Sequence, residues 1–211
     1  PGLTPAQWRS HDGRAPQPRQ ALAVIGPGTG LGVAGVVVRG GHWQAVPGEG
    51  GHVTLSAADA LEDAVLQQVR RRHDHVSAER LLSGIGLPLL HDALGAVQGT
   101  AGASLATEEL VQRGLDGDAT ARRTLDLFCA LLGGFAGNVA LTLGARGGVF
   151  IGGGIVPRLG DFFFASAFRE RFEAKGRFRP YMQAIPTAVI TDTLAALGGA
   201  AAALDQRLMA P

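Results

Sequence analysis

The sequence contains very little cysteine, lysine, asparagine and net charge. Cys129 is the only cysteine among 211 residues, which excludes an intramolecular disulfide and a multi-cysteine zinc site and suits a reducing compartment. The 19 basic and 18 acidic residues leave a formal net charge of +1, which argues against a broad nucleic-acid-binding surface. Lys175 is the only lysine, and we attribute the arginine bias to genome composition rather than to chemistry.

Long apolar runs are also scarce. The best candidate, residues 125–143, is interrupted by Asp126, Asn138 and three glycines and is followed by Gly144, so we do not expect a membrane span. No basic segment followed by an apolar run stands at the start, which predicts a cytoplasmic protein without a signal peptide and without a membrane partner. The chain opens on Pro1 and not on methionine, so we expect it to begin within a longer protein.

Small residues are abundant instead, with 34 alanines and 32 glycines. The length and the 46% of hydrophobic residues are sufficient for a sizeable buried core. After an extended connector over residues 1–20, we expect strands over residues 21–26, 33–38, 42–46, 147–151 and 185–191. We expect helices over residues 59–73, 107–113, 118–143, 162–172 and 194–208, and short ones from Ser77 and from Pro157. Inside the longest helix, Gly133, Gly134 and Gly137 cost about 1 kcal/mol each against alanine, so a packing or ligand reason is expected for them.

The order of these elements is that of an α/β, RNase H-like (actin-like ATPase) domain. Such a domain has a mixed five-stranded sheet, with helices packed on it and further helices inserted. No second domain boundary is visible over residues 21–211.

The sharpest motif is the glycine-rich loop of residues 25–32 (IGPGTGLG), between the first two expected strands. Glycines leave their amides bare, successive bare amides bind anions, and the Thr29 hydroxyl is a further donor. Two interpretations remain open from this loop alone: a phosphate cradle at Gly28, Thr29 and Gly30, or a hairpin with an unusual number of glycines in its turn.

Two common nucleotide motifs do not fit this loop. A dinucleotide fingerprint would need glycine at position 31, where Leu31 stands, and would be followed by a helix and not by a strand. A P-loop needs Gly-Lys-Ser/Thr, whereas Lys175 precedes another glycine. A second glycine cluster, Gly152, Gly153 and Gly154, follows an expected strand and offers either a flat surface for adenosine or a simple tight turn.

Three polar side chains stand in contexts that suit a polyol ligand. Glu49 and His52 lie on a glycine-rich loop (PGEGGH), and Glu79 lies in the first turn of a short helix. Carboxylates accept hydrogen bonds from hydroxyls, and a neutral imidazole both donates and accepts. Taken singly, a surface turn and helix-dipole compensation explain these residues as well. The histidine spacings do not form a metal site.

Five motifs in order resemble the bacterial glucokinase family, within the hexokinase/actin-like superfamily. These motifs are IGPGTGLGVA (25–34), PGEGGHV (47–53), HVSAERLLSG (75–84), GGVFIGGGIVPR (147–158) and KGRF (175–178). The resemblance implies that ATP phosphates bind at residues 28–30 and adenosine at residues 152–154. It implies that Glu49, His52 and Glu79 hold D-glucose hydroxyls, that Mg²⁺ is held mainly through the nucleotide, and that the chain forms a homodimer.

The same resemblance exposes a large departure from the family pattern. Family members begin with a small lobe that carries a D-x-G-G-T-N phosphate loop and an Asn-Asp pair whose aspartate is the catalytic base. Neither motif is present, because the only asparagine is Asn138, inside an expected helix. The chain therefore resembles the large C-terminal lobe alone, with no catalytic base of its own, and is expected to be inactive by itself. The alternative is a non-catalytic module that binds sugar or nucleotide or mediates dimerisation.

Overall fold

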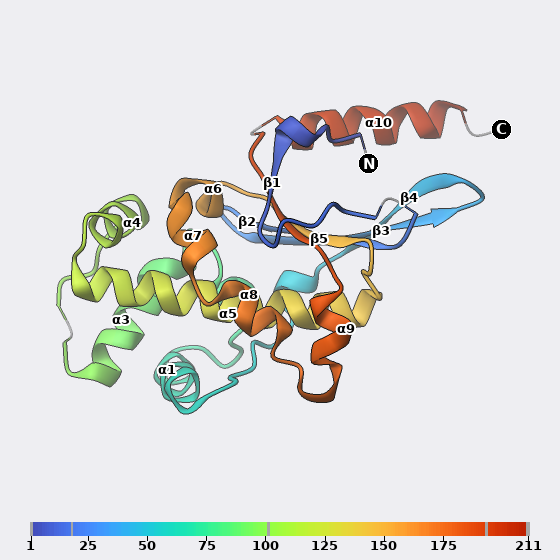
Figure 1. Ribbon diagram of the computed structural model, residues 1–211. Coiled ribbons are helices and arrows are strands. Elements are labelled where there is room, and N and C mark those ends of the chain that lie inside the picture. Colours follow the sequence, from blue (N-terminus) through green and yellow to red (C-terminus); the bar gives the residue numbers. More distant parts are fainter. Residues whose placement is uncertain (1, 18, 101, 193, 210–211) are drawn as a thin grey trace.

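The computed structural model describes residues 2–17, 19–100, 102–192 and 194–209. A six-stranded sheet with the order β1-β6-β5-β2-β3-β4 forms its centre (Figure 1). The strands are β1 (Trp8–Ser10), β2 (Leu22–Pro27), β3 (Leu31–Arg39), β4 (His42–Gly48), β5 (Gly148–Ile151) and β6 (Thr187–Ile190). Strands β2, β5 and β6 are parallel, while β2, β3 and β4 form an antiparallel meander.

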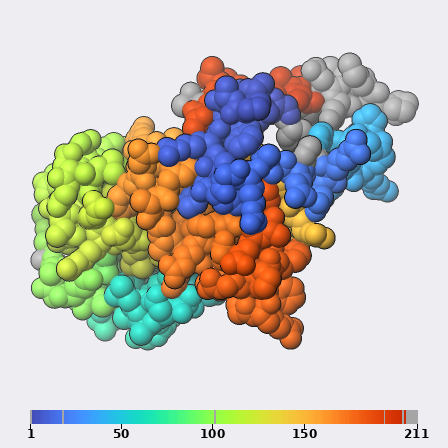
Figure 2. All heavy atoms as spheres, viewed as in Figure 1, coloured from blue at the N-terminus to red at the C-terminus, as the bar shows by residue number. Residues whose placement is uncertain are grey.

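All five expected strands are present, and the predicted fold class is confirmed. The sixth strand, β1, lies within residues 1–20, where we expected only an extended connector, and it pairs antiparallel with β6. Figure 2 shows this N-terminal segment, in blue, against the orange and red C-terminal third of the chain. Trp8 of β1 meets Phe150 edge to face, and both Trp8 and Trp43 pack against a small apolar cluster on this side of the sheet. Both tryptophans are thus packing residues.

Most helices lie on the other side of the sheet (Figure 1). The helices are α1 (Ala60–Arg70), α2 (Ala78–Leu81), α3 (Gly86–Gln98), α4 (Thr107–Leu115), α5 (Ala119–Leu143), α6 (Ile155–Leu159), α7 (Asp161–Ala165), α8 (Phe168–Glu173), α9 (Arg179–Gln183) and α10 (Ala195–Met209). Three short 3-10 helices cover Pro5–Gln7, Gly50–His52 and Gly176–Phe178. The side chains of Asp59, Ser77 and Asp118 cap α1, α2 and α5 as their sequence positions predicted.

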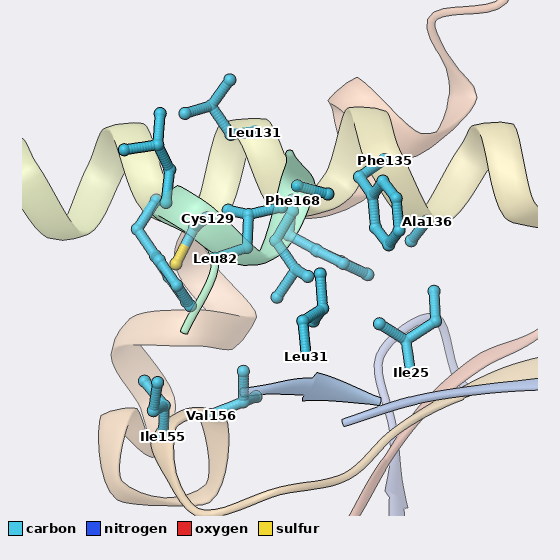
Figure 3. Packing of buried hydrophobic residues seen from close by; sticks show 14 of the residues in the cluster. Ile25, Leu31, Leu82, Cys129, Leu131, Phe135, Ala136, Ile155, Val156 and Phe168 are labelled. Atoms are coloured by element: carbon cyan, nitrogen blue, oxygen red, sulfur yellow. The ribbon is translucent and has the colours of Figure 1, made fainter. Parts of the chain in front are cut away.

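Helix α5 is the centre of the main core. Cys129 is fully buried on it, and burial raises the pKa of its thiol to about 12, so this cysteine is an unreactive core residue (Figure 3). The helix is long and apolar enough to cross a membrane by length and composition, yet 67% of its most apolar stretch is buried inside the molecule. That burial is the pattern of a core helix.

Packing explains two of the three glycines inside α5. A Cβ atom on Gly133 would lie 2.2 Å from the Phe168 carbonyl oxygen, and one on Gly137 would lie 2.7 Å from the Phe172 carbonyl oxygen. Both carbonyls belong to α8, which therefore rests directly on the α5 backbone. A Cβ atom on Gly134 would meet nothing within 4 Å.

This difference predicts opposite effects for two adjacent substitutions. Gly133→Ala should destabilise the fold by about 1–3 kcal/mol, because the α8 backbone must move away. Gly134→Ala should stabilise it by up to about 1 kcal/mol through helix propensity. Urea unfolding of both variants measures the difference, and equal midpoints would show that α8 does not rest on Gly133.

The helix prediction was wrong in two respects: one predicted helix is divided, and helices α3 and α9 were not anticipated. The amphipathic run over residues 162–172 forms two helices, because Ser166 adopts an extended backbone and its hydroxyl donates to the Phe163 carbonyl at 2.6 Å. Helix α3 was not anticipated, although Pro88 falls in its first turn, where proline removes no helical hydrogen bond.

Candidate functional site

The glycine turn of residues 28–30 joins β2 to β3 at the end of the sheet nearest α2. The Gly28 amide, which we expected to be bare, instead donates to the Gly30 carbonyl at 2.9 Å. Among the described residues, the Thr29 and Gly30 amides make no hydrogen bond. Thr29 is exposed and Gly30 is half-buried, so the turn offers two adjacent amides and the Thr29 hydroxyl as donors, which is sufficient to contact one anionic group.

Three contacts fix the turn in place. Leu31 follows it directly and is buried with Leu82 in the space between α5 and the strands (Figure 3). The Gly84 amide donates to the Gly28 carbonyl at 2.7 Å, and the Leu31 amide donates to the Glu79 carboxylate at 2.8 Å. The short α2 segment thus holds both sides of the turn.

The second glycine cluster lies against the first. A Cβ atom on Gly153 would lie 2.2 Å from the Pro27 carbonyl oxygen, and the Gly153 backbone has a left-handed φ of 74°. The Gly152 amide donates to the Ile25 carbonyl at 2.8 Å, which extends the pairing of β5 with β2. The exposed residues Gly153 and Gly154 therefore lie beside the glycine turn, whereas Gly152, which we expected on the same surface, is buried.

Glu49 and His52 flank a 3-10 turn that lies against β3. Glu49 forms an isolated bridge with Val33, and the His52 amide donates to the Glu49 carbonyl at 3.0 Å. A Cβ atom on Gly51 would lie 2.1 Å from the Leu31 carbonyl oxygen, so this loop packs tightly on the residue after the glycine turn. The chain then continues to Thr54, which bridges Ser77 and so positions the start of α2.

The structure brings the three predicted polar residues together. His52 Nε2 lies 3.9 Å from Glu49 Oε2 and 3.9 Å from Glu79 Oε1. The side chains of Glu49, His52 and Glu79 are 90%, 60% and 33% exposed, so the cluster is open to solvent. Two carboxylates on either side of an imidazole can bind vicinal hydroxyl groups.

Metal binding by protein side chains finds no support in the part of the chain that the structure describes. No group of three His, Cys, Asp or Glu side chains there is arranged to hold an ion. A divalent cation at this place would therefore take its ligands from the phosphates of a nucleotide, and the turn amides would hold those phosphates.

Sequence reasoning missed the glycines that let these loops approach one another. Gly51 and Gly84 were part of recognised motifs, but their role in close packing depends on segments that are distant in the chain. The Leu31 amide, a backbone group, gives no signal in the sequence at all.

Comparisons with known proteins identify the family of the chain. The family model described as Glucokinase matches residues 1–207. The glucokinase of Chromobacterium violaceum is 55% identical over 93% of this chain, which covers 57% of that protein. Among solved structures, a glucokinase from an Antarctic psychrotroph superposes with a TM-score of 0.90 at 36% identity, over 97% of this chain and 64% of that one.

A third comparison supports the fold alone. The glucokinase of Balamuthia mandrillaris, solved in complex with glucose, has a TM-score of 0.76 at 22% identity, over 88% of this chain and 55% of that one.

The fold is the actin-like ATPase fold of sugar kinases. Within that class, the chain belongs to the glucokinase family. It spans a little over half the length of the glucokinases described above.

Proposed function

We propose that this chain is the large lobe of a glucokinase, which transfers the γ-phosphoryl group of ATP to the 6-hydroxyl of D-glucose. The observation that carries the proposal is the convergence of Glu49, His52 and Glu79 beside a turn with two unpaired amides. The sugar and the phosphoryl donor must meet at one place. Here the polar cluster and the glycine turn are both next to Leu31, whose amide donates to Glu79 and whose carbonyl packs against Gly51.

Each group has a chemical task in this proposal. The Glu49 and Glu79 carboxylates accept hydrogen bonds from sugar hydroxyls, and His52 donates or accepts between them. Thr29 and Gly30 hold phosphate oxygens, and Gly153 and Gly154 form the surface beneath adenosine. Mg²⁺, bound through the phosphates, would neutralise charge that develops during phosphoryl transfer.

The lobe supplies part of the ATP site and half of the sugar pocket. We infer that the catalytic aspartate and the first phosphate loop belong to a small lobe outside these 211 residues, because the D-x-G-G-T-N motif is absent from the sequence. Family membership further supports a homodimer formed through large-lobe helices and a cytoplasmic location, which a protein with one buried cysteine suits.

Calorimetric titration with D-glucose and with ADP tests the proposal. We expect the chain to bind both ligands, and Glu49→Ala to weaken glucose binding at least about tenfold through loss of a charged hydrogen-bond acceptor. Glu170→Ala, which removes an exposed acid on α8, is the matched control and should leave glucose affinity unchanged. A folded chain that binds neither ligand would refute the proposed function.

A further inference from the structure

The two carboxylate oxygens of Glu79 face different parts of the site. Oε2 accepts the Leu31 amide at 2.8 Å, directly after the phosphate turn. Oε1 lies 3.9 Å from His52 Nε2, on the side of the sugar cluster. Among the described residues, the Glu49 carboxylate makes no hydrogen bond to the glycine turn, and its side chain is 90% exposed. Glu79 alone of the three therefore touches both halves of the site.

Gly30 is shaped to admit this carboxylate. A Cβ atom at position 30 would lie 2.5 Å from Glu79 Oε2 and 3.3 Å from its carboxyl carbon. The backbone of Gly30 is not in the left-handed region, so no conformational requirement calls for glycine there. Gly32 differs, because a Cβ atom there would meet nothing within 4 Å. The absence of a side chain at position 30 thus allows the Glu79 carboxylate to contact the turn.

We propose that Glu79 is a positioning residue for the phosphate turn as well as a sugar ligand, and that it couples the two sites. The inference rests on the proposed function and adds to it a route between sugar and nucleotide. A hydroxyl that binds Oε1 restrains the carboxylate, and the carboxylate restrains the Leu31 amide and the turn that precedes it. Each ligand should then strengthen the other's binding, because coupling between two sites is reciprocal.

Substitutions at position 79 separate positioning from sugar binding. Saturating D-glucose should raise the ADP affinity of the unmodified chain about fivefold, at the lower end of known couplings. Glu79→Ala should lower ADP affinity about fivefold or more and abolish that glucose effect, because the Leu31 amide loses its acceptor. Glu79→Gln retains an oxygen that can accept from Leu31, so ADP affinity should recover to within about twofold while glucose affinity stays low.

Glu49→Ala is the matched control for this series. It removes a sugar acceptor that does not touch the turn, so it should weaken glucose binding and leave the affinity for ADP alone unchanged. Calorimetric titrations of each variant, with and without the second ligand, give all of these constants.

A substitution on the turn gives a second, independent test. Gly30→Ala should displace the Glu79 carboxylate and weaken glucose binding about tenfold, although residue 30 lies on the phosphate side. Because the atom displaced is the end of a flexible side chain, the fold should tolerate the change, as thermal unfolding would verify. In the Glu79→Ala background, Gly30→Ala should cause no additional loss of glucose affinity. Gly32→Ala should leave glucose affinity unchanged.

The outcomes distinguish the two levels of the argument. The inference is supported if Gly30→Ala lowers glucose affinity, if Glu79→Ala lowers the affinity for both ligands, and if Glu79→Gln restores ADP affinity. If the unmodified chain binds both ligands but Glu79→Ala changes glucose affinity alone, the coupling is wrong and the proposed function stands. If the unmodified chain binds neither ligand, the proposed function fails and the inference fails with it.

Discussion

With ATP, Mg²⁺ and D-glucose, the 211-residue chain should form glucose 6-phosphate at least about 10⁴-fold more slowly than the full-length glucokinase of Chromobacterium violaceum. The proposed site offers hydrogen-bond acceptors to sugar hydroxyls and amides to phosphate, but the sequence lacks the D-x-G-G-T-N motif and the Asn-Asp pair expected from the resemblance to glucokinases. A positioned base contributes about 10²–10⁴ in rate, and exclusion of water by lobe closure adds to that.

A coupled assay for glucose 6-phosphate measures this difference. The Chromobacterium violaceum enzyme is a suitable reference because it is 55% identical over the shared region. Turnover within tenfold of the reference would contradict the proposed division of labour between lobes. A chain that forms no glucose 6-phosphate but still binds glucose and ADP would agree with two interpretations, an isolated lobe of a kinase and a non-catalytic binding module.

Gly153→Ala is expected to have the largest effect on the fold around the nucleotide site. The backbone at this position has a φ of 74°, which costs an L-residue about 1–2 kcal/mol. The added Cβ atom would also lie 2.2 Å from the Pro27 carbonyl oxygen and 2.6 Å from its carbonyl carbon. Since both obstacles are backbone, the β5–α6 loop must separate from the end of β2.

We expect a loss of about 3 kcal/mol in the free energy of unfolding, from strain and overlap together. For a chain of this size, that loss lowers the melting temperature by about 6–12 °C. ADP affinity should fall at least about tenfold, because the two glycine clusters no longer lie side by side.

Gly154→Ala is the control for stability. Its backbone φ is −93°, and a Cβ atom there would meet nothing within 4 Å. Calorimetric melting of the two variants should therefore differ by several degrees. Equal melting temperatures would mean that the Gly153 loop does not rest on Pro27.

Much of the fold could be predicted from local pattern. Four of the five expected strands are short apolar runs with a glycine or proline at or near one end, and the first residues of α1, α2 and α5 are preceded by side-chain caps, so composition and spacing locate these elements. Strand β1 could not be found in this way, because Trp8–Ser10 has no apolar run and pairs with β6 from 180 residues further along the chain. Long-range pairing of that kind leaves no periodic signal.

The candidate site, like the fold, could be predicted from the sequence only in part. Motif order located Glu49, His52 and Glu79, and the structure places them together. Their contacts with the turn could not be predicted, because Glu79 reaches a backbone amide 48 positions earlier. The internal bond from the Gly28 amide to the Gly30 carbonyl depends on the turn's exact dihedral angles, which alternating glycines do not determine.

The most direct measurement is a glucose titration of the isotopically labelled chain, followed by the backbone amide resonances of each residue in solution. We expect D-glucose to shift the amide resonances of Glu49 and His52 and, through Glu79, that of Leu31, while the resonances of α4 stay in place. A folded chain in which saturating glucose moves none of these three amides would contradict the claim that sugar and phosphate groups meet at this turn.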